Sequence, residues 1–249
     1  MSGHSKWATI KHKKGAADAK RGRLFTKLIR EITVSARMGG GDASNNPRLR
    51  KAVADAKGQQ MPQDTIQRAI KRGTGELEGA NYEEVLYEGT GPGGTLLLIE
   101  GVTDNRNRTV AELRKIFEKH NGSLGSSGTA AWAFDRKGVF QIPSSVGEDQ
   151  LMDVAIEAGA DDYENTGDAW QVTAPVEAFD AVTKAFESAD IEIQQSGLEY
   201  LPKAKKPLAG RDAEVVLNLT DALDDHDDVQ NVFADFDISD EEMARISGE

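Results

Sequence analysis

The stretch that decides the fold is residues 137–200, which read KGVFQIPSSVGEDQLMDVAIEAGADDYENTGDAWQVTAPVEAFDAVTKAFESADIEIQQSGLEY. Short alternating apolar runs, typical of strands, are separated by runs with apolar residues at helical spacing. We expect a strand, a helix, two strands, a helix and a strand, at Gly138–Ile142, Glu148–Ala158, Asp162–Thr166, Trp170–Thr173, Val176–Ser188 and Ile191–Glu199. The order βαββαβ predicts a ferredoxin-like split βαβ unit.

The sequence on either side of this unit predicts a second α/β domain that is interrupted by it. Before the unit we expect strands at Tyr82–Glu88, Thr95–Gly101 and Ala130–Phe134, with a helix over about 108–120 that begins with a Thr109–Glu112 capping box. The helix and strand that would complete this set occur only later, at Asp212–Leu223 and Val229–Phe236. We therefore predict a discontinuous domain of residues 76–136 and 206–249, with residues 137–205 inserted, including the return linker.

Residues 1–75 predict a small helical domain. The first helix, about 17–38, has an apolar stripe and ends at Gly39-Gly40-Gly41, where glycine adopts the C-cap conformation easily. Asn46 is the expected N-cap of a second helix that has Pro47 at its first position. A third helix is expected from Pro62 to Gly73. The predicted fold class is α+β: an N-terminal three-helix basic bundle followed by two α/β domains, one ferredoxin-like and inserted in the other.

Charge is distributed very unevenly along the chain. The formal net charge of the 249 residues is −12, yet residues 1–75 hold seventeen Lys and Arg against five Asp and Glu. The rest of the chain holds thirteen basic and 37 acidic residues. Such a division between two parts of a chain indicates a polyanionic partner for the basic part.

The candidate nucleic-acid-binding residues are the cations of the tail and helices, together with one tryptophan among them. Cations that neutralise phosphates give affinity through counterion release, and an indole offers a face for base stacking. The set is Lys6, Trp7, Lys11, Lys13, Lys14, Lys20, Arg21, Arg23, Lys27, Arg30, Arg48, Arg50, Lys71 and Arg72. The alternative is a solvated basic surface, with Trp7 packed on its own domain.

A second, weaker candidate is the polar segment Thr103–Arg108. Arg106 and Arg108 lie beside the start of a predicted helix, where guanidinium groups and backbone N–H groups together can bind a phosphate. The alternative is turn and capping chemistry, with Asp104 pairing an arginine within the chain. The residues alone favour neither.

Other patterns give no catalytic or metal site. Asp224–Asp228 lacks the spaced ligands and central glycine of a calcium loop, so we interpret it as a helix end with solvated acids. The four histidines lack zinc-site spacing, and Gly122–Gly128 lacks the ending of a phosphate-binding loop, so we expect a flexible loop there. A hydrolase is the enzymatic rival, but no nucleophile–base–orienter set can be assembled. We expect no cofactor and no enzymatic activity.

Composition narrows the remaining possibilities. A chain of 249 residues exceeds the usual size of one domain. The absence of cysteine excludes disulfides, iron–sulfur clusters and thiol catalysis. No apolar run is long enough to span a bilayer, and no secretory signal is present. We expect a cytoplasmic protein without a membrane partner.

Several motifs, spread from one end of the chain to the other, resemble the YebC family. They are Gly3-His4-Ser5-Lys6-Trp7, Ile10-Lys11-His12-Lys13-Lys14, Asp18-Ala19-Lys20-Arg21-Gly22, Phe25-Thr26-Lys27-Leu28-Ile29-Arg30-Glu31-Ile32, Asn46-Pro47-Arg48-Leu49-Arg50, Met61-Pro62, Arg68-Ala69-Ile70-Lys71-Arg72-Gly73, Thr103-Asp104-Asn105-Arg106-Asn107-Arg108-Thr109 and Asp228-Val229-Gln230-Asn231-Val232.

This resemblance implies a cytoplasmic, non-enzymatic regulator of gene expression with three domains. Bacterial relatives are described as probable DNA-binding transcriptional regulators. Others, including the mitochondrial translational activator of a cytochrome oxidase subunit, act on the ribosome, where relief of stalling at proline runs is proposed. The expected partner is therefore DNA or ribosomal RNA, with a further protein partner for the acidic domains. The alternative function is a protein–protein adaptor without direct nucleic-acid contact.

Overall fold

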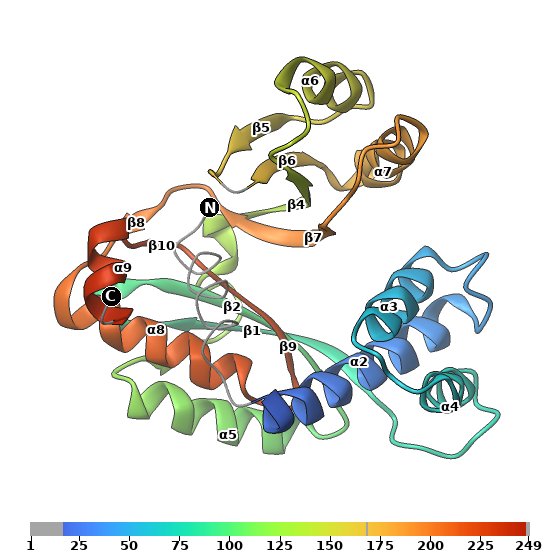
Figure 1. The fold of residues 1–249 in the computed structure, drawn as a ribbon. Coiled ribbons are helices and arrows are strands. Elements are labelled where there is room, and N and C mark those ends of the chain that lie inside the picture. The colour runs from blue at the N-terminus through green and yellow to red at the C-terminus, as the bar shows by residue number, and fades with distance from the viewer. Residues whose placement is uncertain (1–16, 168, 248–249) are drawn as a thin grey trace.

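The computed structural model describes residues 17–167 and 169–247, with side chains from residue 21 onward. Its first part is the expected group of three helices, α2 (Ala17–Gly39), α3 (Pro47–Gly58) and α4 (Gln63–Gly73). In Figure 1, α2 begins beside the end of α8 and runs out to α3 and α4. An apolar core joins the three helices, and its fully buried members include Ile32, Leu49 and Ile66.

The helix ends in this region follow the sequence closely. Asn46 is the N-cap of α3, and its side chain accepts a hydrogen bond from the Leu49 N–H at 3.1 Å. The same side chain donates to the Ser35 carbonyl at 2.8 Å and so ties α3 to α2. Gly73 lies so close to α2 that an added Cβ would come within 2.7 Å of the Ala36 Cβ. The predicted caps and bundle are therefore confirmed.

A four-stranded sheet follows, with strand order β3-β1-β2-β9. Its strands are β1 (Glu83–Thr90), β2 (Leu96–Thr103), β3 (Ser123–Leu124) and β9 (Val229–Ala234). Helices α5 (Arg106–Lys119) and α8 (Gly210–Asp224) lie together along one face of this sheet (Figure 1). β9, which comes from the end of the chain, pairs antiparallel with β2, so the two segments expected to form one domain do share a sheet.

Alternation along β2 divides the packing between the two faces of this sheet. Leu97 and Ile99 belong to the core that α5 and α8 cover. Leu98 points the other way and packs with Phe134 and other apolar residues. All three residues have no exposed surface, as expected for a central strand covered on both faces.

The second sheet has strand order β5-β6-β4-β7 and is antiparallel throughout. It consists of β4 (Phe134–Pro143), β5 (Asp162–Asn165), β6 (Ala169–Pro175) and β7 (Gln195–Pro202), with α6 (Glu148–Glu157) and α7 (Phe179–Ser188) as its helices. This is the strand order of a ferredoxin-like unit. Because β4 runs without a break through the predicted boundary at 136/137, the limits of the domains remain a prediction.

Several local expectations were wrong. Ala130–Phe134 is not a strand, because Ala131–Ala133 forms a short 3₁₀ helix (η2) and β4 begins only at Phe134. α5 is capped by Asn105 rather than by a Thr109–Glu112 box, because the Asn105 side chain accepts from the Arg108 N–H. The last strand of the inserted unit begins at Gln195, not Ile191.

Other short elements were not predicted. They are β8 (Lys206–Pro207), which pairs parallel with β10 (Phe236–Asp237), the helix α9 (Asp240–Ser247), and two further 3₁₀ turns, η1 (Pro92–Gly94) and η3 (Val176–Ala178). Among the described helices, none combines the length and apolar character needed to cross a membrane.

The Gly122–Gly128 segment is anchored rather than flexible as expected. Glu88, a buried residue of β1, accepts backbone N–H hydrogen bonds from Gly128 at 2.8 Å, Ala130 at 2.5 Å and Ala131 at 2.8 Å. Burial by itself would raise the pKa of this carboxyl group, but the three backbone donors outweigh that effect and lower it. One ionised side chain thus holds the connection between β3 and β4.

We predict that Glu88→Gln lowers the free energy of unfolding at pH 7 by about 1–3 kcal/mol, because an amide cannot accept from all three donors equally well. The folded-state pKa of Glu88 lies below the unfolded value of about 4.3, so its stabilisation is complete above that value and is lost as pH falls through the folded pKa. The deficit of the variant should therefore shrink in acid. Urea denaturation from pH 7 to pH 3 measures it. Glu118→Gln, at an exposed site on α5, is the control and should show almost no deficit.

Candidate nucleic-acid interface

The structure does not describe all of the predicted binding residues. Lys6, Trp7, Lys11, Lys13 and Lys14 lie outside the described residues. Lys20 lies within α2, but its side chain is outside the described part of the chain as well. The remaining predicted residues divide into cations that contact the chain's own carboxylates and cations that do not.

Three predicted cations of α2 contact the acidic segment that follows α8. Arg23, Lys27 and Arg30 recur at intervals of four and three residues and so project from one side of the helix. The Arg23 guanidinium lies 3.6 Å from the Asp225 carboxylate, and the Lys27 Nζ lies 3.0 Å from the Asp224 carboxylate. The Arg30 Nη1 lies 2.6 Å from the Asp228 carboxylate. This side of α2 is therefore occupied by acids from residues 224–228.

The same cations also contact the backbone at the end of α8. The Lys27 Nζ donates to the Asp224 carbonyl at 2.6 Å, and Arg30 donates to the Asp227 carbonyl. Asp224 is the last residue of α8, and a cation at a helix C-terminus is stabilised by the helix dipole. The predicted helix end is correct. The expectation of solvated acids is wrong for Asp228, whose side chain is only 2% exposed.

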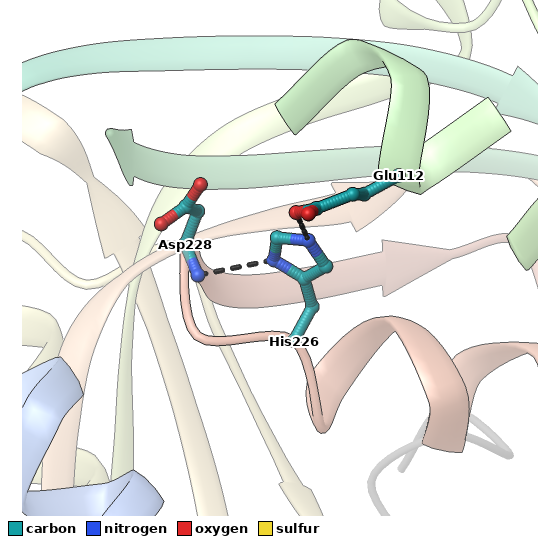
Figure 2. A group of neighbouring side chains, drawn as sticks. All are labelled: Glu112, His226 and Asp228. Atoms are coloured by element: carbon teal, nitrogen blue, oxygen red, sulfur yellow. Dashed lines mark hydrogen bonds and ion pairs between the residues drawn. The ribbon is translucent and has the colours of Figure 1, made fainter. Parts of the chain in front are cut away.

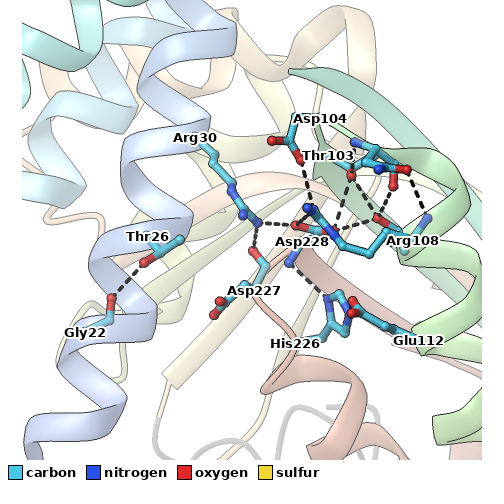
Figure 3. Close-up of polar contacts among 12 residues, drawn as sticks. Gly22, Thr26, Arg30, Thr103, Asp104, Arg108, Glu112, His226, Asp227 and Asp228 are labelled. Atoms are coloured by element: carbon cyan, nitrogen blue, oxygen red, sulfur yellow. Dashed lines mark hydrogen bonds and ion pairs between the residues drawn. The ribbon is translucent and has the colours of Figure 1, made fainter. Parts of the chain in front are cut away.

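Asp228 is the centre of a polar network that joins α2, β2 and α5 (Figure 3). Besides Arg30, its carboxylate is 2.9 Å from the Arg108 Nη2, and it accepts hydrogen bonds from the hydroxyls of Thr109 at 2.6 Å and Thr103 at 3.3 Å. Burial favours the neutral acid, but the Thr109 and Arg108 hydrogen bonds and the charge of Arg30 together lower the pKa of Asp228. Asp228 therefore remains an anion at neutral pH although it is buried.

The Thr103–Arg108 segment forms the turn that begins α5. The Thr103 hydroxyl accepts from the Asn105 N–H at 2.9 Å, and the Asn105 side chain caps the helix. Arg108 lies between Asp104 and Asp228, each 2.9 Å from its Nη2. These contacts match the structural alternative for Arg108, which was turn and capping chemistry with an internal pair to Asp104. Arg106 also has an internal partner, Glu83, at 2.8 Å, although its side chain is 59% exposed.

Glu112, His226 and Asp228 bring possible metal-ligand atoms within 4.8 Å of one another (Figure 2). The His226 Nδ1 accepts the Asp228 backbone N–H at 3.1 Å, so Nε2 carries the proton and donates to the Glu112 carboxylate at 2.9 Å. The Asp228 oxygens already contact the two guanidinium groups of Arg30 and Arg108. A metal ion there would be placed beside two positive charges, so these residues do not fit a cation.

Two further cations bind the helical region to the first sheet. Arg48, a predicted binding residue, contacts the carboxylate of Glu31 in α2 at 2.7 Å and that of Glu84 in β1 at 2.6 Å. Arg37, which was not singled out from the sequence, donates to the Asn81 side chain at 2.5 Å and the Tyr82 carbonyl at 2.6 Å. Both contacts depend on residues far apart in the sequence, so neither had a local signal.

Four predicted binding residues remain without an acidic partner among the described residues. Arg21 donates to the Gln60 side chain at 3.4 Å, and Arg50 donates to backbone carbonyls of Ala43 and Ser44. Lys71 and Arg72 are exposed in the last turn of α4. Together with the exposed Lys57 at the end of α3, they form the part of the described basic surface that is open to a ligand.

A groove of about 590 Å³ lies where the helical region meets the first sheet. Its walls are made by charged side chains from α2, from the start of α5 and from the segment after α8: Arg23, Arg30, Arg108, Glu112, Asp225, His226, Asp227 and Asp228. Both signs of charge line it, which suits an electrostatic contact between two parts of the chain better than an apolar ligand.

Comparison with known proteins gives a consistent result over the full length. Residues 5–76 match the TACO1/YebC protein N-terminal domain, and residues 82–236 match the TACO1/YebC second and third domain. A probable transcriptional regulatory protein of Geobacter sp. (strain M21) is 53% identical over 246 residues, which cover 99% of this chain and 100% of that protein. Another of that description, from Desulforapulum autotrophicum, is 55% identical over 242 residues, covering 97% and 98%.

A solved structure shares the fold. A conserved hypothetical protein from Aquifex aeolicus superposes with a TM-score of 0.85 at 43% sequence identity, covering 94% of this chain and 98% of that one. With both family regions matched and relatives above half identity over almost the whole chain, the protein belongs to the TACO1/YebC family.

Proposed function

We propose that this protein is a non-enzymatic regulator of gene expression that binds nucleic acid through residues 1–75. The observation that carries the proposal is the charge division: an excess of twelve positive charges in residues 1–75 against an excess of 24 negative charges in residues 76–249. The regulatory role is supported by the names of the relatives, which are called probable transcriptional regulatory proteins. Action in the cytoplasm is part of the same proposal.

The described contact surface of this proposal is the open basic surface formed by Arg21, Arg50, Lys57, Lys71 and Arg72. The tail cations and Trp7, which the structure does not describe, would extend it. Arg and Lys side chains without acidic partners neutralise phosphates at little cost, whereas a cation already paired must first lose its carboxylate. We therefore assign first contact to the open cations and not to Arg48, Arg106 or Arg108.

The nucleic acid is either DNA or ribosomal RNA. On DNA, the helical region would make phosphate contacts with weak base readout. On the ribosome, long basic side chains would suit an irregular phosphate surface, in keeping with a translation factor that relieves stalls at proline runs. Co-sedimentation with ribosomes in moderate salt, compared with binding to defined DNA duplexes in the same buffer, separates them. Absence from ribosomes combined with a sharp footprint at one promoter would contradict the RNA version.

A protein–protein adaptor is the second candidate. It is favoured by one observation: Arg23, Lys27 and Arg30 bind carboxylates of the chain itself, so the basic region does accept protein acids as partners. An adaptor would keep its partners after nuclease treatment of a cell extract, whereas the nucleic-acid proposal expects the association to be lost.

An enzymatic role has little support among the described residues. Within the described residues, His226 contacts Glu112 and the Asp228 backbone, and no hydroxyl group there hydrogen-bonds to its ring. A general base without a nucleophile or a substrate-facing donor does not form a catalytic set.

We predict that Lys71→Glu with Arg72→Glu weakens binding to any nucleic acid and lowers the slope of log K against log salt by about 2, since each phosphate contact contributes about one unit. Fluorescence anisotropy over a salt series measures both. Arg114→Glu with Lys115→Glu is the matched control, because it reverses one Arg and one Lys that are adjacent and exposed on α5. Equal loss in both variants would mean that only net charge matters, and the assignment to α4 would be wrong.

For the tail, Lys13→Glu with Lys14→Glu should weaken binding across all sequences and reduce the salt slope in the same way. The measurement is the same titration, with one DNA duplex and one structured RNA as ligands. If affinity and slope both stay at the wild-type values, these two lysines do not touch phosphate.

A further inference from the structure

We propose that the acidic segment of residues 224–228 is an internal competitor for the nucleic acid: it occupies the Arg23, Lys27 and Arg30 side of α2, and a phosphate backbone displaces it. The inference rests on the proposed function and adds a second, covered part to the binding surface. In the structure described here the covered part is closed. On binding, α2 would exchange carboxylates for phosphates, and the helical region would separate from the sheet.

The first support is the kind of contact that holds the helical region in place. Among the described side chains, its apolar core is built from residues between Phe25 and Ile70, and the cores of the two sheets contain none from this region. What joins the parts is polar, namely the pairs Arg23–Asp225, Lys27–Asp224, Arg30–Asp228 and Arg48–Glu84 with the hydrogen bonds of Arg37. The Arg23–Asp225 and Arg48–Glu84 pairs are partly exposed and therefore weak and salt-sensitive, whereas the Arg30–Asp228 pair is buried and harder to break. Among the described residues, separation of the two parts opens none of these apolar cores.

The second support is the geometry of the acids. Three carboxylates lie along one side of α2, each beside a different cation, and two backbone carbonyls contact Lys27 and Arg30 as well. A phosphate backbone also presents a row of anionic oxygens, and it carries a full charge on each unit. Charge-assisted hydrogen bonds from Arg and Lys form to carboxylate and phosphate alike, so the segment and a nucleic acid are interchangeable ligands for this side of α2.

The third support is that opening leaves no buried charge without a partner. If Arg30 withdraws, Asp228 keeps Arg108 and the hydroxyls of Thr109 and Thr103. Arg30 itself is incompletely satisfied in the closed arrangement, because its Nε is buried and has no hydrogen-bond partner in the part of the chain that the structure describes. A bidentate phosphate contact would use that donor as well. The network is thus complete on the sheet side and incomplete on the helix side.

The competition sets the apparent affinity for nucleic acid. If only the open fraction of molecules offers the full α2 surface, the apparent dissociation constant rises in inverse proportion to that fraction. Weakening the internal contact should therefore tighten binding, although no residue of the binding surface changes. Removing acids from an ordinary surface has no such specific effect.

The first experiment compares the double variant Asp224→Asn, Asp225→Asn with the wild type. A defined DNA duplex and a defined structured RNA are titrated separately. We expect about two- to tenfold tighter binding, the range given by the loss of two ion pairs whose carboxylates are about half exposed. Asp153→Asn with Asp180→Asn removes the same charge from exposed sites on α6 and α7 and is the control. Equal tightening in both double variants would overturn the proposal, because it would be an effect of net charge alone.

A double-mutant cycle tests the exchange of ligands directly. Arg23→Gln with Lys27→Gln removes cations that are covered in the wild type but available when the acids are neutralised. We expect it to weaken binding several-fold more in the Asp224→Asn, Asp225→Asn background than in the wild type. Additive effects would mean that α2 and the acids do not compete.

Separation of the two parts is observable without any assumption about function. The chain has no cysteine, so Gln67→Cys in α4 and Asn218→Cys in α8, both exposed, accept spin labels cleanly. Double electron–electron resonance should give a single distance between the labels at low salt. A second population with a longer distance should appear at high salt, with inorganic polyphosphate, or in the Asp224→Asn, Asp225→Asn variant. A single unchanged distance under all three conditions would contradict the proposal.

The outcomes distinguish this inference from the function on which it rests. If the wild type and the acid variant both fail to bind DNA and RNA, the proposed function is wrong, and the spin-label distances alone decide whether the parts separate. If both bind with equal affinity, the function stands and the internal competition is wrong.

Discussion

The arrangement of this molecule depends on one buried carboxylate. Asp228 has almost no contact with solvent, yet it is ionised, because Arg30, Arg108, Thr109 and Thr103 surround it with charge and hydrogen-bond donors. An unpaired carboxylate at this depth would be strongly destabilising, so these partners are required by its burial. Three of them come from the sheet and α5, and the fourth comes from α2. One side chain thereby fixes the start of α5, the turn before β9 and the position of the helical region.

The uneven distribution of charge produces ion pairs within the molecule as well as a surface for a partner. The acidic segment of residues 224–228 and the basic side of α2 attract each other. In the structure they form specific ion pairs, so neither surface is left open. The cations that stay open are Arg21 in α2, Arg50 and Lys57 in α3, and Lys71 and Arg72 in α4, and all five are exposed. A polyanion approaching residues 1–75 would therefore meet these first and reach α2 only in exchange for the acids.

The sequence predicted the helices and strands well, but it did not predict which charged side chains form ion pairs, and the reasons are physical. Caps and periodicity are local, so Asn46, Pro47 and Gly73 predicted the helices of the first region, and the spacing of apolar residues predicted the sequence of strands and helices along the chain in the ferredoxin-like unit. Ion pairs across the fold are not local. Nothing near Arg30 in the sequence indicates Asp228, which lies 198 positions later. The same holds for Arg48 with Glu84. The prediction that these helix cations bind nucleic acid was based on counting charges, and a charge count does not show which acids the fold brings beside each cation.

The central claim is that nucleic acid lies against residues 1–75. Ultraviolet crosslinking of the full chain to bound nucleic acid in cells, with mass spectrometry of the attached peptides and sequencing of the attached strands, tests this most directly. The account predicts crosslinked peptides from the tail and from the ends of α3 and α4, with few from the two sheets. Crosslinks concentrated within residues 82–236, or a yield no higher than that of a protein that does not bind nucleic acid, would contradict it.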